Sequence, residues 1–317
     1  MISHAVILAM SYMNGHVIRR DNMFNIQDTS HLTVKEQLAY QRFVDQLMDV
    51  ELPTRPYIKL TSFELIDETL LSSKVGGTPF LKSFDDIPVD ANDEHMALLF
   101  QINLSDLPDE QEIIPAKRGL IQFWISADED LYGCDFNKVS EKVNNRLIYI
   151  EDLETGLTFE AIKAHFEELE IDEDVLPYRG VIGFDFELSE QSIVQSASEF
   201  HPIMDDIWKK ANPDFDYKQN ISEHIELMHV VHKTFSSNDV FHQIGGYPFF
   251  TQEDPRYGFE DLSDFDTLLI QIDSDNVADD TDASIMWGDC GVCNLFVRHE
   301  DLAQMKFDDY IYNWDCL

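Results

Sequence analysis

Alternating apolar and polar positions predict β-strands in two separate stretches of the chain. Residues 98–104 read LLFQINL, which places Leu98, Phe100 and Ile102 on one face and Gln101 on the other. This period of two is typical of a strand that is buried on one side. Similar patterns predict strands at 57–65, 119–126, 145–152, 181–188, 267–273, 284–288, 291–298 and 310–314.

Apolar residues at helical spacing predict helices before and between these strand groups. Residues 33–52 carry Leu38, Phe43 and Leu47 on one face. Thr33 can begin this helix, and Pro53 ends it. Further helical patterns cover 158–171, 197–211 and 221–235, with a short helix or turn at 299–307. Strands gathered in two groups, with helices before and between them, indicate an α+β fold.

Three sequence blocks occur twice in the same order, which indicates an internal duplication. The offset between copies is 169 residues at the first glycine (245 − 76) and 172 at the later glycine (291 − 119). We therefore expect two sheet-rich halves related by a pseudo-two-fold axis. The paired blocks are VGGTPF (75–80) and IGGYPF (244–249), LLFQINL (98–104) and LLIQIDS (268–274), and GLIQFWI (119–125) and GVCNLFV (291–297).

The duplication suggests a division of the chain. Residues 1–56 form an N-terminal segment whose helix packs on the body, and residues 57–317 form a single unit. No linker rich in Pro, Gly and Ser interrupts this unit. It contains a first repeat (about 57–155), a helical middle (about 156–238) and a second repeat (about 239–317).

The charge of the chain restricts its partners. The 317 residues include 61 Asp and Glu against 22 Lys and Arg, a net charge of −39. Such a chain repels nucleic-acid phosphates and anionic membrane surfaces. The charge has two readings that stay open: it serves solubility alone, or it attracts a basic protein partner.

The N-terminal residues and the cysteines favour a soluble cytoplasmic protein. The apolar run AVILAM (5–10) is too short for a secretory signal or a membrane span. The four cysteines are too few and too scattered for a disulfide framework.

Cys290 and Cys293 form a CxxC motif, which can be a redox pair or half of a zinc site. No second pair with this spacing exists, and a strand pattern rather than a helix follows. We interpret both cysteines as small buried residues.

Two further motifs resemble metal sites only in part. His229 and His232 share a helical face, but neither they nor His224 form an HExxH motif. The acidic run at 273–282 lacks the Gly and Glu of a helix–loop–helix calcium site. We expect a solvated loop there, and no metal or other cofactor.

Gln101 and Gln271 occupy matching positions in the two copies. A buried glutamine needs hydrogen-bond partners, and the Gly-Gly turn of its own half can supply them. The alternative is a polar cleft at the interface of the two repeats. The other candidate residues for such a ligand or partner site are Trp124, Asp273, Asp275, Trp287 and Asp289.

The repeated motifs, with WGDCGVCNLF (287–296) and YIYNWDC (310–316), resemble the YwqG-like family of uncharacterised bacterial proteins. The resemblance covers roughly residues 57–317. It implies no catalytic activity, because the family has none established. Some members lie beside polymorphic toxins, so the resemblance implies an immunity-type role.

The sequence shows no Walker-type glycine loop, no GxGxxG after a strand and no GxSxG elbow. We expect a non-catalytic binding protein, such as an immunity protein that masks a basic toxin. The alternative is an enzyme or small-ligand-binding protein with a cleft where the repeats meet.

Overall fold

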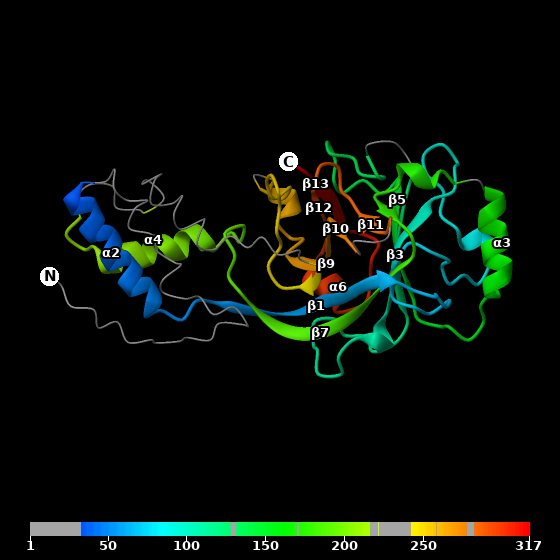
Figure 1. The fold of residues 1–317 in the computed structure, drawn as a ribbon, viewed down its shortest axis with the longest axis horizontal. Coiled ribbons are helices and arrows are strands. Elements are labelled where there is room, and N and C mark those ends of the chain that lie inside the picture. The colour runs from blue at the N-terminus through cyan, green and yellow to red at the C-terminus, as the bar shows by residue number, and fades with distance from the viewer. Residues whose placement is uncertain are drawn as a thin grey trace. The chain divides into compact units, whose positions relative to one another are not determined.

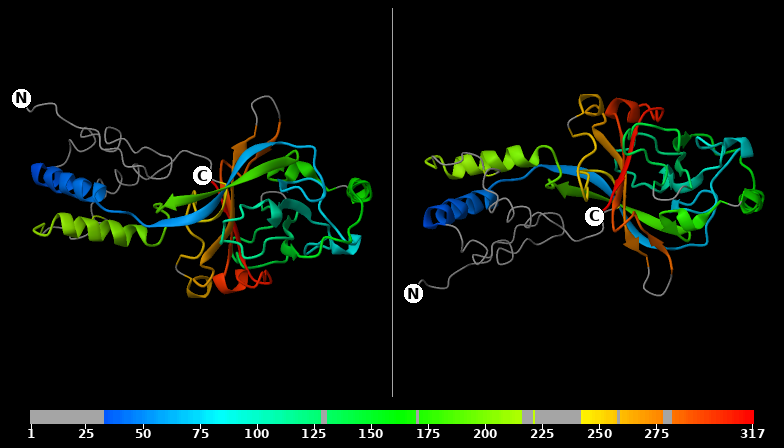
Figure 2. Two further views of the ribbon diagram at one scale, coloured as in Figure 1. Left: turned by 90° about the horizontal axis from the view of Figure 1, so that it is seen from below. Right: turned by 90° about the horizontal axis from the view of Figure 1, so that it is seen from above.

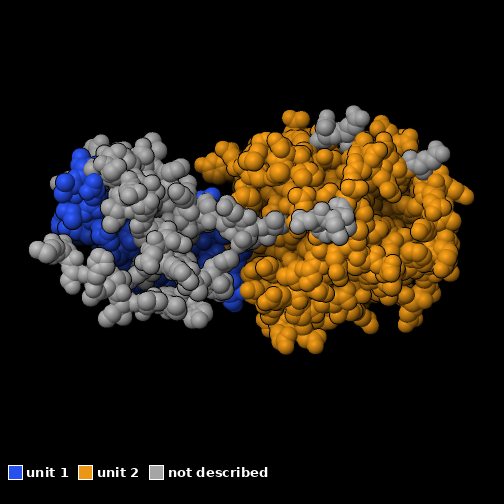
Figure 3. Space-filling model, viewed as in Figure 1, with its two compact units in different colours: residues 1–55, 190–239 blue, residues 56–189, 240–317 orange. Residues whose placement is uncertain are grey.

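The computed structural model divides the chain into two compact units, coloured separately in Figure 3. Unit 1 contains residues 1–55 and 190–239, and unit 2 contains residues 56–189 and 240–317. The described residues are 33–127, 131–169, 171–215, 221, 242–257, 259–277 and 282–317.

Two helices pack together in unit 1. Helix α2 (Val34–Met48) begins at a capping box, in which the side chains of Thr33 and Glu36 each bond the backbone of the other. Helix α4 (Phe200–Ala211) carries Pro202 in its first turn, where a proline fits. The remainder of the helix expected at 221–235 lies outside the described residues.

An apolar face joins these two helices. The rings of Phe43 and Trp208 lie 5.9 Å apart, and Asn212 Nδ2 donates to the carbonyl of Ala39. Leu38, which the pattern placed on this inner face, is 57% exposed. The prediction for Leu38 was wrong because the buried face lies one position further, through Ala39 and Phe43.

The ten strands that form one sheet among the described residues occur in the order β13-β12-β9-β8-β1-β7-β2-β3-β4-β5. Its strand pairs β13–β12, β12–β9, β9–β8, β8–β1, β7–β2, β2–β3, β3–β4 and β4–β5 are antiparallel. Figures 1 and 2 show the long strands β1 and β7, which are central in this order, side by side. The order is symmetric: a short strand and then three further strands flank this central pair on each side. The bounds are β1 Thr54–Leu65, β2 Lys74–Val75, β3 Ala97–Asn103, β4 Leu120–Ile125, β5 Asn145–Ile150, β7 Ile182–Ser192, β8 Gln243–Gly245, β9 Thr267–Asp273, β12 Val292–Val297 and β13 Ile311–Asp315.

Smaller elements complete unit 2. Strands β10 (Asp275–Asn276), β11 (Ser284–Ile285) and β6 (Tyr178–Arg179) form a separate three-stranded sheet. The helices of this unit are α3 (Phe159–Leu169), α6 (His299–Leu302) and the 3₁₀ turns Phe84–Asp86, Leu104–Asp106, Glu173–Val175 and Glu260–Leu262.

A β-bulge interrupts each of the two strands that carry the glutamines. In β3 the register against β4 shifts between Leu98 and Phe100, which leaves Leu99 as the extra residue. In β9 the register against β12 shifts in the same way around Leu269. The prediction that Leu98 and Phe100 share a face was therefore wrong, because a bulge moves the following side chains to the other face.

The sheet curls around one large apolar core, in which the first half (57–155) meets the second half (239–317). The ring of Phe123 on β4 lies 4.9 Å from the ring of Tyr312 on β13. The segment between β4 and β5 also reaches β13, because Val139 O accepts from the Tyr312 N–H at 3.0 Å. Aromatic side chains and backbone bonds therefore fill the surface between the halves.

Separate apolar clusters cover the outer face of each half. On the first half, helix α3 (labelled in Figure 1) carries Ile162 and Phe166, which pack with Trp124 of β4. On the second half, Phe250 packs against Phe296 of β12. The described residues thus form an α+β fold with a large curled antiparallel sheet and few helices. None of the described helices has the length and apolar character needed to cross a membrane.

Candidate functional site

Gln101 is fully buried and makes four hydrogen bonds at the first Gly-Gly turn. Its Nε2 donates to the carbonyls of Leu70 (2.9 Å) and Ser72 (3.0 Å). Its Oε1 accepts from the N–H of Phe80 (3.0 Å) and from Gln122 Nε2 (2.8 Å). The side chain therefore ties the loop before the turn to the segment after it, as a buried amide that serves backbone groups.

Gln122 on β4 extends this network outward. Its Nε2 also donates to the carbonyl of Phe80 at 2.9 Å, so both backbone groups of Phe80 are held by side-chain amides. Its Oε1 accepts from the indole Nε1 of Trp124 at 3.2 Å. Trp124 thus belongs to the support of the turn.

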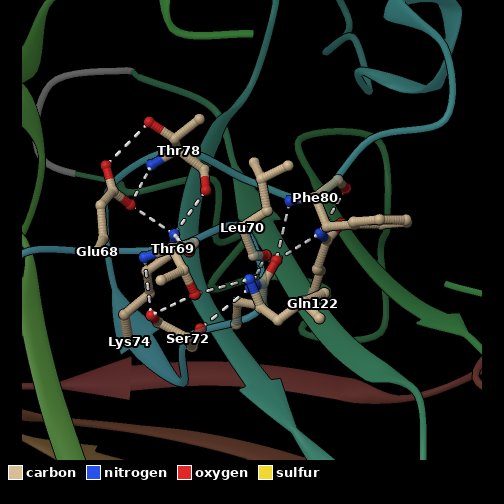
Figure 4. A network of polar contacts seen from close by, with 10 residues as sticks. Glu68, Thr69, Leu70, Ser72, Lys74, Thr78, Phe80 and Gln122 are labelled. Carbon is tan, nitrogen blue, oxygen red and sulfur yellow. Dashed lines mark hydrogen bonds and ion pairs between the residues drawn. The ribbon is translucent and has the colours of Figure 1, made fainter. Parts of the chain in front are cut away.

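Lys74 on β2 is buried and carries a charge into the same network, which Figure 4 shows. Its Nζ forms an ion pair with Glu68 and donates to the carbonyls of Thr69 (3.1 Å) and Thr78 (2.6 Å). The Glu68 carboxylate also accepts from the N–H (2.8 Å) and hydroxyl (2.9 Å) of Thr78. Burial lowers the pKa of Lys74 below its usual value, and Glu68 acts in the opposite direction.

The second Gly-Gly turn has hydrogen bonds at the corresponding positions. Gln243 Nε2 donates to the carbonyl of Tyr247 at 2.9 Å. Gln271 Oε1 accepts from the Phe249 N–H at 2.7 Å, and Asn294 Nδ2 donates to the Phe249 carbonyl at 3.0 Å. The corresponding residues are Lys74 and Gln243, Thr78 and Tyr247, Phe80 and Phe249, Gln101 and Gln271, and Gln122 and Asn294.

Glycine is needed at the start of the first turn for two reasons. Gly76 has a φ of +69°, which L side chains rarely adopt. A Cβ there would lie 2.5 Å from the ring of Tyr178. The turn therefore packs closely against β6.

An open, shallow groove of about 460 Å³, lined mostly by apolar residues, lies beside the first turn. One wall comes from the loop before β2, and the other comes from Phe80 and the segment after β5. Leu71 is 40% exposed, so this lining is open to solvent. The lining residues are Thr69, Leu70, Leu71, Phe80, Leu153, Gly156 and Leu157.

Exposed carboxylates lie in the same segments that form the groove. Asp67 precedes one wall, and Glu154 lies within the other. Lys82, two residues after Phe80, is paired with Asp152 at 2.8 Å. A ligand in this groove would therefore meet apolar side chains at its centre and negative charge at its edge.

Asp273 and Asp275 meet at a buried histidine. The N–H of Asp273 donates to His242 Nδ1 at 3.1 Å, so the proton of a neutral His242 lies on Nε2. This Nε2 lies 3.5 Å from a carboxylate oxygen of Asp275. The ring of Phe63 stacks on the imidazole at 4.1 Å. The cluster holds β8 against β9 and β10.

The remaining candidates lie apart from these groups. Trp287 is fully buried in the central core, with its ring 5.7 Å from that of Tyr132. Asp289 is exposed, and its carbonyl accepts from the Leu317 N–H at 3.5 Å. Four strands of the sheet separate β3, which carries Gln101, from β9. The structure thus joins Gln101 with Trp124, and Asp273 with Asp275.

The CxxC motif divides between two environments. Cys293 is buried, and burial raises the pKa of its thiol well above the usual value. Cys290 is exposed with a φ of +59°, so its interpretation as a buried residue was wrong. The turn from Trp287 to Gly291 places it outside the strand.

Among the described residues, no three His, Cys, Asp or Glu side chains lie close enough together to hold a metal ion. Asp279 and the three helical histidines of the sequence prediction lie outside the described residues.

The sequence prediction missed Lys74, Glu68, Gln122 and Asn294. The internal alignment contained a signal for two of them, since Gln122 and Asn294 are polar residues at one mid-strand position of GLIQF and GVCNL. Nothing in the pattern marked Lys74 as buried, because lysine is almost always exposed.

Comparison with known families gave one match. The family described as "Domain of unknown function (DUF1963)" matches residues 73–316. No curated protein matches the chain significantly.

Proposed function

The chain belongs to the DUF1963 family, a domain of unknown function, and from its own residues we propose that it is a non-catalytic binding protein for a basic protein partner. The observation that carries this proposal is the excess of carboxylates. If each of the 22 Lys and Arg neutralised one carboxylate, 39 of the 61 would remain unpaired. A field of this size steers a basic partner to the surface and speeds association.

The charge is also concentrated. Residues 151–174 carry ten Asp and Glu and one Lys. Glu154, Glu160 and Glu167 are exposed there. A concentrated acidic surface on a folded unit favours a specific partner over solubility alone, because solubility does not require clustering.

An immunity-type role, in which the protein masks a basic toxin, is the finer form of this proposal. It rests on the resemblance of the motifs to the YwqG-like group, a narrower assignment that we also propose. A cytoplasmic location goes with it.

We further propose that the two halves arose by duplication and are related by a pseudo-two-fold axis. The symmetric strand order supports this, as do the bulges at Leu99 and Leu269, which are 170 residues apart (269 − 99). The matched bonds of Gln101 and Gln271 to the turns add a third, independent similarity.

The alternative, an enzyme or ligand-binding protein with a cleft between the repeats, has less support. Phe123, Tyr312 and Trp287 are buried in the surface where the halves meet. The glutamines proposed for the cleft instead hold backbone groups of the turns.

Affinity capture from a native lysate at low salt, followed by elution at high salt, tests the binding proposal. We expect a basic protein to be retained and then released, because salt screens charge attraction. Failure to retain any basic protein at low salt would contradict the proposal.

A further inference from the structure

We propose that the apolar groove beside the first Gly-Gly turn is where the basic partner docks. The occupant is a polypeptide segment that carries one large apolar side chain between Lys or Arg residues. This inference rests on the proposed function and adds to it the site and the chemistry of the contact.

The lining favours an apolar anchor. Leu70, Leu71 and Leu153 offer aliphatic side chains around the ring of Phe80. Gly156 packs directly against this ring, because a Cβ there would lie 2.6 Å from it, and Phe80 itself is only 3% exposed, so the leucines form the accessible lining. Burying an apolar side chain against such a surface contributes roughly 25 cal/mol per Å².

The rim favours positive charge next to the anchor. Asp67 lies two residues before Thr69, and Glu154 directly follows Leu153, both exposed. Glu160 lies three residues after Leu157 on the first turn of α3 and is also exposed. A second copy of this chain carries the same charge of −39 and would be repelled, so the occupant is a different, basic protein.

The polar network keeps the groove in place before a partner arrives. Gln101 holds the carbonyl of Leu70 on one wall and the N–H of Phe80 on the other. Figure 4 shows Leu70, Thr69 and Phe80 around these bonds. The Leu157 N–H donates to the carbonyl of Leu81 at 2.8 Å, which fixes the third segment. A preformed site loses less conformational entropy on binding.

The sequence of the second half does not repeat this lining. At the positions that correspond to Leu70 and Leu71 it has Asp239 and Val240. The sequence of the second half therefore lacks the leucine pair that lines the groove of the first half.

Three labelled synthetic peptides test the proposal by fluorescence anisotropy at low salt. The first has a tryptophan flanked by three lysines on each side, the second replaces the tryptophan with alanine, and the third replaces the lysines with glutamates. We expect the full-length protein to bind the first peptide about ten-fold tighter than the second, the gain from burying part of one indole. The third peptide should not bind.

Two groove variants and one matched control locate the site. Leu71→Ser and Leu153→Ser should each reduce the ten-fold preference for tryptophan to about two-fold. Leu188→Ser, at a leucine on β7 that is 37% exposed, should leave it unchanged. Both groove leucines are partly exposed, and thermal unfolding of each variant confirms that it remains folded.

The outcomes separate the two proposals. If neither lysine peptide binds, the basic partner is contradicted together with the groove. If both lysine peptides bind equally, or if the groove variants keep the ten-fold preference, only the groove assignment is overturned.

Discussion

The two Gly-Gly turns are held at the same backbone groups, by a glutamine in both at one position and by different side chains at two others. At the first turn the carbonyl of Thr78 accepts from the ammonium of Lys74, which is paired with Glu68. At the second turn the carbonyl of Tyr247 accepts from the neutral amide of Gln243. Both turns therefore have this hydrogen bond, but its donor is charged at the first turn and neutral at the second.

The difference extends to the side chains that surround Gln122 and Asn294. Gln122 Oε1 accepts from the indole of Trp124, whereas the corresponding Asn294 Oδ1 is buried without a partner among the described residues. Phe296 lies at the position corresponding to Trp124 and has no donor. The first turn, in which Trp124 donates to Gln122, is also the turn that borders the groove.

Removal of Lys74 should give the largest loss of stability. Lys74→Ala leaves the Glu68 carboxylate without its counter-charge and the Thr78 carbonyl without its donor, which should cost about 3–5 kcal/mol of unfolding free energy. Gln243→Ala removes a neutral donor at the second turn and should cost about 1–3 kcal/mol. Urea unfolding of both variants measures the difference.

A matched double variant sharpens this result. Lys74→Gln with Glu68→Gln copies the neutral arrangement of the second turn and should recover part of the loss. Equal stability of Lys74→Ala and Gln243→Ala would show that the buried charge makes no difference between the turns.

Loss of the bracketing glutamine should have the next largest effect. Gln101→Leu leaves the Phe80 N–H and the Leu70 carbonyl without their side-chain partner, which should lower the unfolding free energy by about 2–3 kcal/mol. Gln252→Leu, at a side chain with an exposed bond to Cys316, should stay within about 0.5 kcal/mol of the parent. Denaturant midpoints check both variants. A Gln101→Leu variant as stable as the parent would contradict the bracketing role.

Trp124→Phe should make the first turn resemble the second. It removes the donor to Gln122 Oε1 and should cost about 1 kcal/mol. In a Gln122→Met background the same substitution should cost less, because the acceptor is already gone. A double-mutant cycle that shows no coupling between the two positions would contradict this prediction.

The smallest expected effect concerns a buried carboxylate of the second half. Burial raises the pKa of Asp315 above 3.8, against the N–H bonds from Gln252 and Thr251. With a raised pKa, the folded state binds the proton of Asp315 more tightly than the unfolded state does. This group therefore stabilises the fold fully below pH 3.8, and its contribution is lost as the pH rises through the folded-state pKa. The unfolding free energy of the parent minus that of Asp315→Asn should therefore be more positive near pH 4 than at pH 7.

Urea unfolding at the two pH values tests this direction. The prediction fails if the unfolding free energy of the parent minus that of the variant is more positive at pH 7, because a carboxylate with a depressed pKa behaves in that way.

Strands and helices with clear periodicity could be predicted from the sequence. Residues 33–52, 119–126 and 158–171 contain α2, β4 and α3, with ends that differ by a few residues. The pattern could not reveal the bulge at Leu99, because one extra residue changes the face of a strand without changing its composition.

The candidate site was harder to predict. The glutamines were found because they occur twice, and their bracketing of the turns was one of the two readings. Lys74 was missed because a buried lysine depends on Glu68, which lies in a loop without a repeating pattern. The groove was missed because its walls lie about 80 residues apart in the sequence, at Leu71 and Leu153.

Hydrogen–deuterium exchange of the full chain, with and without the peptide of one tryptophan flanked by lysines, compares the two turns most directly. The peptide should slow amide exchange at residues 69–81 and 153–157 and leave residues 243–250 unchanged. Slower exchange at 243–250, or binding without any change at 69–81, would contradict the claim that the two turns share a scaffold but only the first one docks a basic partner.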